Sequence, residues 1–237
     1  MASTTHNDPQ PVGASLPGWK PRARPVREVL TGRTCRLEPL VAATHADVLF
    51  EANSADGSGR MWTYLPYGPF ENQASYRSWM ERASQAEDPL FFAIVDLASG
   101  KPVGIAAYLR IEPANGVIEI GHLAFSPVLQ RTTAATEALY LLIERAFALG
   151  YRRCEWKCDT LNAPSRAAAQ RLGFTFEGIF RQAVVIKGRN RDTAWYSIID
   201  TEWPARREAF ERWLAPENFD EQGRQRTPLA AGSERRG

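Results

Sequence analysis

The residues best suited to chemistry lie between Glu119 and Ala135, where an apolar strand pattern passes through a short loop into a long helix pattern. The free N–H groups and the dipole of a helix start attract a phosphate. Arg131 adds a cation at this start, and Thr132 and Thr133 add hydroxyl donors. These features indicate a site for a phosphate-bearing ligand, and an ordinary capped helix is the alternative.

Two side chains on the strand before this loop are candidates for moving a proton. Glu119 could act as a general base, or it could simply pair with Arg110. The ordinary pKa of a histidine suits proton transfer, which makes His122 a second candidate. Strand alternation puts His122 on the opposite face from Glu119 unless a bulge intervenes. A histidine packed into the protein is the alternative.

Apolar spacing predicts the elements that position these side chains. We expect strands at 34–40, 90–96, 103–112, 117–125, 153–159, 174–180, 182–187 and 193–202. We expect helices at 44–53, with Thr44 as the N-cap, and at 71–86, 133–149, 163–172 and 203–214. The pattern predicts an α/β (α+β) fold, in which helices flank a mixed, mostly antiparallel sheet of about seven strands.

Composition and charge indicate how the chain is organised. The chain has 237 residues, of which 44% are hydrophobic and 24% charged, and its formal net charge is +2. These values exclude a wholly disordered chain, a collagen-like repeat and a highly charged nucleic-acid binder. We expect a flexible N-terminal arm at 1–30, one domain at 31–215 and a polar tail at 216–237. The basic arm is expected to be solvated, and contact with an acidic partner such as RNA is the alternative.

Membrane segments and metal ligands are not indicated by the sequence. No apolar run reaches the roughly 18–20 residues that span a bilayer, and the first residues form no hydrophobic signal core. We therefore expect a cytoplasmic protein without a membrane partner. Cys35, Cys154 and Cys158 are expected to be buried thiols, with a metal or redox pair of Cys154 and Cys158 as the alternative. The three histidines are scattered, so we expect no metal site.

Several motifs follow one another in the sequence between residues 34 and 203. The first leads from Glu119-Ile120-Gly121 through Ser126-Pro127 to Ala135-Thr136-Glu137-Ala138. The others are Asn162-Ala163-Pro164-Ser165, Arg171-Leu172-Gly173-Phe174, Glu177-Gly178, and Asp192 with Tyr196 in the last hairpin. Together these motifs resemble the GNAT acetyltransferase superfamily, and more narrowly its branch of ribosomal-protein N-terminal acetyltransferases.

The resemblance implies acetyl transfer from acetyl-CoA to a primary amine by direct attack in a ternary complex. The amine would be a protein N-terminus or a small molecule. Glu119 would act as the base, and Ser165 would donate a proton to the departing thiolate. His122 remains a further catalytic candidate because the ordinary histidine pKa suits proton transfer. The implied acetyl-CoA residues are Leu123, Ala124, Phe125, Gln130, Arg131, Thr132, Thr133, Ala134, Ala135, Asn162 and Ser165. A helix-capping role is the alternative for Asn162 and for Ser165.

The loop departs from the family pattern at two positions. Gln130 and Ala135 fit the pattern, whereas Arg131 and Thr133 stand where glycines are common. A glycine lets the backbone approach a pyrophosphate closely, and contacts from arginine and hydroxyl groups can replace that approach. We expect acetyl-CoA binding to be retained. The alternative function is a degenerate domain that binds acyl-CoA or a partner without catalysis.

The acceptor is expected to bind at 61–70, a stretch dense in aromatic residues. Trp62, Tyr64 and Tyr67 could wall a pocket for an amine, because aromatic faces attract cations, and Glu119 would contact the same amine. A loop folded over the core is the alternative. The expected partners are acetyl-CoA and an amine acceptor, with no nucleic acid, and the chain would be a monomer or a homodimer.

Overall fold

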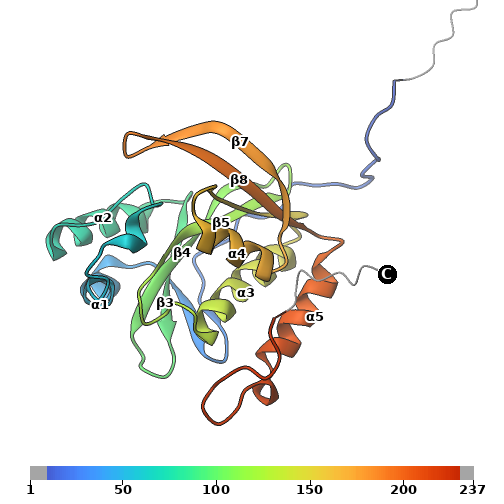
Figure 1. Cartoon of the computed structure of the whole chain (residues 1–237). Helices are drawn as coiled ribbons and strands as arrows, with labels where there is room; N and C mark the ends of the chain where they lie inside the picture. The colour runs from blue at the N-terminus through green and yellow to red at the C-terminus, as the bar shows by residue number, and fades with distance from the viewer. Residues whose placement is uncertain (1–9, 230–237) are drawn as a thin grey trace, which may run out of the picture.

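Eight strands form one mixed sheet in the order β1-β2-β3-β4-β5-β6-β8-β7 (Figure 1). The computed structural model describes residues 10–229. Neighbouring strands are antiparallel except β5 and β6, which run parallel. The strands are β1 (Leu30–Thr31), β2 (Cys35–Pro39), β3 (Leu90–Asp96), β4 (Pro102–Glu112), β5 (Val117–Phe125), β6 (Arg153–Asp159), β7 (Thr175–Ile186) and β8 (Arg189–Ile199).

Helices cover both faces of the sheet (Figure 1). α1 (Ala42–Ser54) and α2 (Gln73–Gln85) pack on one face, over the strand residues Phe91, Ala93, Ile105, Ala107 and Ala124. α3 (Thr133–Ala148), α4 (Ala163–Arg171) and α5 (Trp203–Leu214) belong to the other face, over Phe92, Ile94, Ala106, Tyr108, Ile118 and Ile120. Because both faces of β3 are covered, that strand is apolar at successive positions rather than alternating.

The predicted fold class is confirmed, and most predicted elements lie where the sequence pattern placed them. The strands at 90–96, 117–125 and 153–159 and the helix at 203–214 have the predicted bounds. The sheet also contains the two-residue β1, which the sequence pattern did not reveal. The segments at 174–180 and 182–187, which were predicted as two strands, form the single strand β7.

A bulge explains why β7 continues through the predicted break. The register with β8 shifts between Phe180 and Val184, and Gln182 has a φ of 50°. The strand bends there without ending. β7 is the last strand of the sheet and is exposed along most of its length, including the apolar residues Phe176, Ile179, Phe180, Val184 and Val185.

The prediction that Thr44 caps the first helix is wrong. α1 begins at Ala42, and its N-cap residue Val41 makes no side-chain capping bond. The amide of Val41 instead donates to Nδ1 of His45 at 3.1 Å, and Nε2 of His45 lies 3.0 Å from Glu38. The buried side chain of His45, in the first turn of α1, therefore satisfies the amide of Val41, the residue before the helix.

The described parts of the terminal segments contact the domain. Trp19 donates from its indole to the carbonyl of Ala114 at 2.9 Å, and the amide of Arg22 donates to Pro113 at 3.0 Å. At the other end, Leu229 is buried and belongs to the same hydrophobic core cluster as the buried residues of α3. The ends of the predicted arm and tail, residues 1–9 and 230–237, lie outside the described residues.

Three further properties bear on function. The cysteines Cys35, Cys154 and Cys158 are buried free thiols, as predicted. Within residues 10–229, no helix has the length and apolar character needed to cross a membrane. No group of three or more His, Cys, Asp and Glu side chains in the same range is arranged to hold a metal ion.

Candidate active site

The parallel strands β5 and β6 part soon after they meet. Their register joins Val117 to Arg153, Ile118 to Cys154 and Glu119 to Glu155, whereas β5 continues to Phe125 and β6 to Asp159. Beyond Glu119, β5 keeps its pairing with β4 on the other side. The backbone of Leu123, Ala124 and Phe125 therefore has a side that no strand of the described sheet covers. Free N–H and C=O groups on such a side can bind an extended ligand.

A bulge in β5 brings His122 to the face on which Glu119 lies. The register with β4 passes from Ala107 and Gly121 directly to Ile105 and Ala124, and His122 has a φ of 53°. The prediction that His122 lies on the opposite face is therefore wrong, because the bulge that would overturn it is present.

His122 packs against aromatic side chains. Its ring stacks on that of Tyr67 at 5.6 Å, and Nδ1 lies 3.3 Å from the Tyr67 hydroxyl. Burial, with a smaller contribution from the positive charge of Arg191, lowers the pKa of His122 to about 4. The imidazole is therefore neutral at physiological pH, when it can accept or donate a hydrogen bond but is a weak base.

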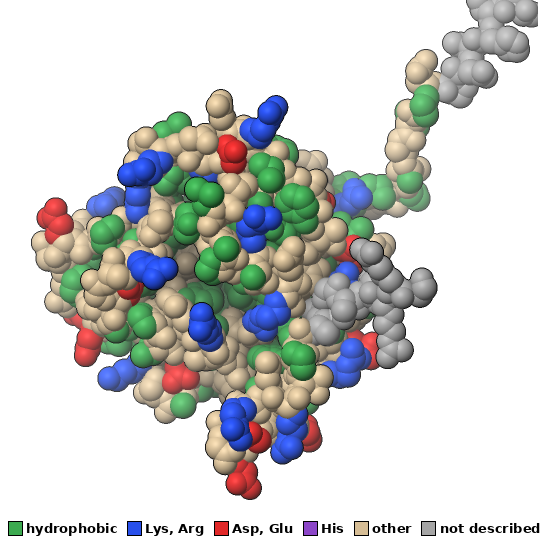
Figure 2. All heavy atoms as spheres, viewed as in Figure 1, with side chains coloured by type: hydrophobic (Ala, Val, Ile, Leu, Met, Phe, Trp, Pro, Cys, Tyr) green, Lys and Arg blue, Asp and Glu red, His purple; other side chains and the backbone are tan. Residues whose placement is uncertain are grey.

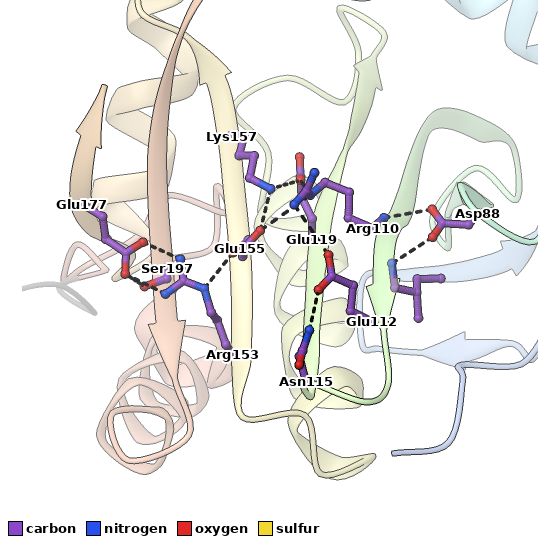
Figure 3. Close-up of polar contacts among 11 residues, drawn as sticks. Asp88, Arg110, Glu112, Asn115, Glu119, Arg153, Glu155, Lys157, Glu177 and Ser197 are labelled. Carbon is purple, nitrogen blue, oxygen red and sulfur yellow. Dashed lines mark hydrogen bonds and ion pairs between the residues drawn. The ribbon is translucent and has the colours of Figure 1, made fainter. Parts of the chain in front are cut away.

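Glu119 belongs to a buried group of charges that joins three strands (Figure 3). Lys157 of β6 donates from Nζ to Glu119 at 2.7 Å and lies 2.6 Å from Glu155. Arg110 of β4 lies 3.5 Å from the same oxygen of Glu119. Only 7% of the Glu119 side chain and 7% of the Lys157 side chain are exposed, so both charges are almost wholly removed from water.

The surroundings of Glu119 act on its basicity in opposite directions. Burial raises its pKa, because a carboxylate loses hydration there, and the negative charge of Glu155 adds to this effect. The positive charges of Lys157 and Arg110 oppose the rise. The net result is a pKa above the ordinary glutamate value. Glu119 is therefore a stronger base than an exposed carboxylate, as a general base working near neutral pH requires.

The loop between β5 and α3 takes a conformation that glycine would adopt without strain. Arg131 has a φ of 63°, in the left-handed region. Thr133 is the first residue of α3 and needs no such conformation. One of the two substitutions of glycine noted in the sequence therefore falls on a position whose backbone still has the geometry that glycine favours.

The start of α3 keeps several amides free. Thr132 is the N-cap, and its hydroxyl accepts from the amide of Ala135 at 3.1 Å. Gln130 uses its side-chain amide to donate to the carbonyl of Phe125 at 2.8 Å. The amides of Arg131, Thr133 and Ala134 make no hydrogen bond to any of the residues that the structure describes. These three donors can accommodate a phosphate group.

Basic side chains surround this part of the surface. Figure 2 shows Lys and Arg side chains spread around a recess near the middle of the face that carries α3 and α4. Three of the arginines in this region, Arg131, Arg166 and Arg171, form no ion pair with any carboxylate of residues 10–229. Unpaired cations beside free helix amides favour an anionic ligand.

Asn162 caps α4, whereas Ser165 lies within the first turn of the helix and contacts the core. The side chain of Asn162 accepts from the amide of Ser165 at 3.2 Å. The hydroxyl of Ser165 accepts from the indole of Trp156 at 3.0 Å, and its own hydrogen can be donated to the thiol of Cys158, a weak acceptor. Trp156 and Lys157 are neighbours on β6 and point to opposite faces, so Ser165 and Glu119 lie on opposite faces of the sheet beside the parting strands.

The predicted acceptor segment is folded over the core and tied to the rest of the domain. Trp62 is buried and packs edge-on against Tyr67 and Phe70. Tyr64 donates from its hydroxyl to the carbonyl of Leu161 at 3.0 Å, and Lys187 donates to the carbonyl of Trp62 at 2.7 Å. The segment is thus linked to the β6–α4 loop and to the β7–β8 hairpin. Tyr67 reaches the catalytic candidates through His122.

The sequence analysis missed two residues of this site, Lys157 and Trp195. They are paired across β6 and β8, and Nζ of Lys157 lies 3.8 Å from the centre of the Trp195 ring. Their alternation within the two strands was visible in the sequence. The register that places them beside Glu119 was not.

The family model described as acetyltransferase (GNAT) domain matches residues 35–175, so the chain belongs to the GNAT family and is an acetyl-CoA-dependent acyltransferase. A GCN5-related N-acetyltransferase from Brucella melitensis is 52% identical over 90% of this chain and 97% of that chain, with a TM-score of 0.89.

Two further relatives are more distant. A probable acetyltransferase of the GNAT family from Chromobacterium violaceum is 42% identical over 83% of this chain and 98% of that chain, with a TM-score of 0.77. The ribosomal-protein-serine acetyltransferase of Escherichia coli (strain K12) is 33% identical over 102 residues, which are 42% of this chain and 56% of that protein. The chain therefore matches little more than half the length of this relative, and the match agrees with the ribosomal-protein branch.

Proposed function

We propose that this chain transfers the acetyl group of acetyl-CoA to a primary amine, with Glu119 as the general base. The proposal rests on the geometry at the point where β5 and β6 separate. The open side of β5 there lies between the buried carboxylate of Glu119 and the free amides at the start of α3. A single elongated ligand can contact both ends of this region.

The acetyl-CoA residues proposed from the sequence are consistent with that placement. The amides of Arg131, Thr133 and Ala134 and the guanidinium of Arg131 would hold the pyrophosphate. The open side of Leu123, Ala124 and Phe125 would bind the pantetheine arm, with one amide directed at the oxyanion. Acetyl-CoA supplies the thioester carbonyl that the amine attacks.

The proton steps fall to residues of the chain. The acceptor arrives as an ammonium and must lose a proton before it attacks, and the raised pKa of Glu119 suits it to take that proton. The neutral His122 can hold a hydrogen bond to the amine but is too weak a base to lead. Ser165, whose hydroxyl hydrogen is otherwise shared with the weak acceptor Cys158, would donate to the sulfur of the departing thiolate.

The acceptor is proposed to be a protein N-terminus or a small-molecule primary amine. The hydrogen bonds of Tyr64 and Lys187 hold the segment at 61–70 in place, and Tyr67 of this segment lies against His122. The name of the Escherichia coli relative describes action on a ribosomal protein, which supports a protein N-terminus and a cytoplasmic location for this chain.

The first experiment is a calorimetric titration with acetyl-CoA, followed by an assay of thiol release with peptides bearing a free N-terminus and with small primary amines. Binding in the micromolar range and thiol release with one class of amine would support the proposal. Binding without thiol release from any amine would favour the degenerate, non-catalytic domain. No heat and no thermal stabilisation at millimolar acetyl-CoA would overturn cofactor binding itself.

A further inference from the structure

We propose that Lys157 and Glu155 are positioning residues for this reaction, in which Lys157 orients and tunes Glu119 and Glu155 holds Lys157 in place. The inference rests on the proposed function, because it assigns partners to the base. Neither residue is expected to touch the substrate. The three side chains are called the Glu119–Lys157–Glu155 triad below.

The register of the parallel strands creates the triad. Glu119 and Glu155 are direct partners across β5 and β6, at the last position before the strands part. Two carboxylates side by side in a buried site repel each other strongly. Lys157 lies two residues after Glu155, on the same face, and its ammonium reaches both carboxylates, at 2.7 and 2.6 Å.

Each member of the triad is held from more than one side. Arg153 donates to the second oxygen of Glu155 at 2.7 Å and also binds Glu177, which fixes Glu155 (Figure 3). The ring of Trp195 covers Lys157, with Nζ 3.8 Å from the ring centre. The side chains of the triad are only 6–7% exposed. Such a buried, ion-paired arrangement has little freedom to change its geometry.

The charged groups that face Glu119 come from three strands. Arg110 approaches from β4, but it is half exposed and 3.5 Å away. Lys157 and Glu155 approach from β6 and are buried. His122, on β5 itself, is neutral at physiological pH. Burial has the largest effect on the pKa of Glu119 and raises it. Among the neighbouring charges, Lys157 has the largest effect and favours the carboxylate, whereas Glu155 disfavours it.

The second carboxylate explains how Glu119 can change its protonation state. When Glu119 takes the proton of the amine, it stops being a counter-ion for Lys157. A buried ammonium without a partner is costly. Because Glu155 remains ionised at 2.6 Å, Lys157 keeps a counter-ion throughout the cycle. A simple Glu119–Lys157 pair would lose this compensation, and it would hold Glu119 in its weakly basic form.

The test uses two substitutions whose effects have opposite signs. Lys157→Met removes the positive charge, so the acidic limb of the pH profile of kcat/KM is expected to move to higher pH by about one unit or more. Glu155→Gln removes a negative charge and leaves the Lys157 ammonium to Glu119, so the limb is expected to move to lower pH. Lys157→Arg keeps the charge and is expected to restore much of the wild-type profile. The matched control is Lys101→Met, at an exposed turn, which should change nothing.

The inference would be overturned if the acidic limb of the pH profile stayed in place, or moved in the same direction, in Lys157→Met and Glu155→Gln. If Lys157→Met fails to fold, Glu155→Gln alone decides, because a merely structural role predicts lower activity without a shift to lower pH. If the wild-type protein transfers no acetyl group, the proposed function fails first. The triad is then tested by NMR titration of ¹³C-labelled glutamate carboxyls, with the Glu119 signal assigned from Glu119→Gln, and the same opposite shifts are expected.

Discussion

The imidazole of His122 lies parallel to the ring of Tyr67, with the ring centres 5.6 Å apart and the planes at 5°. This pair joins the strand that carries the catalytic candidates to the segment at 61–70. It depends on the bulge in β5, since a regular strand would place His122 on the other face.

The burial of His122 predicts a pH dependence of stability. A histidine whose pKa falls from 6.5 in the unfolded chain to about 4 in the fold stabilises the protein by staying neutral. This stabilisation is complete above pH 6.5 and is lost as the pH falls from 6.5 towards 4. Between pH 8 and pH 5 the loss is about 2 kcal/mol. Urea unfolding at both pH values should show it in the wild type and not in His122→Asn, a residue that tolerates the positive φ. Equal losses in the two proteins would contradict the prediction.

Substitutions of Arg131 should separate the backbone from the side chain. Arg131→Ala and Arg131→Gly both remove the guanidinium, so both should weaken acetyl-CoA binding about tenfold in a calorimeter. Only the glycine variant relieves the left-handed conformation, and it should be about 1 kcal/mol more stable than the alanine variant. If the two variants differ in affinity but not in stability, the loop conformation matters for binding and not for folding.

Glu119→Gln should abolish the proposed base while keeping its shape. We expect kcat to fall by about 100- to 10,000-fold and the acidic limb of the pH profile to disappear. Acetyl-CoA affinity should stay unchanged, because the loop and α3 do not involve Glu119. An unchanged pH profile would remove Glu119 from this role.

The hydroxyl of Ser165 contacts both Trp156 and Cys158, so its catalytic and structural roles need a double-mutant cycle. Ser165→Ala leaves the indole N–H of Trp156 without its acceptor and should cost about 1–3 kcal/mol of stability. In a Trp156→Phe background the same change should cost almost nothing. The proposed proton donation predicts that kcat falls on Ser165→Ala in both backgrounds. A kcat that falls only with stability would assign the Ser165 side chain to packing.

The sequence predicts the elements of this fold better than the contacts between them. The helix at 133–149 and the strand at 90–96 follow from apolar periodicity, which depends on neighbours along the chain. The bulges at His122 and Gln182 place non-glycine residues at positive φ, and no residue type marks these positions. Lys157 became part of the site only through the pairing of β5 with β6, which join residues far apart in sequence. The predicted cap of α1 is wrong for a different, local reason, because His45, held by Glu38, accepts from the amide of Val41 in place of the expected threonine.

The outermost strand β7 exposes five large apolar side chains and has no neighbour on its outer side within residues 10–229. A straight strand of this composition is a template for pairing with other chains and for aggregation. The register shifts at Phe176–Gly178 and Phe180–Val184 interrupt its row of hydrogen-bonding groups. The irregular backbone of β7 therefore protects the sheet against growth by addition of a further strand.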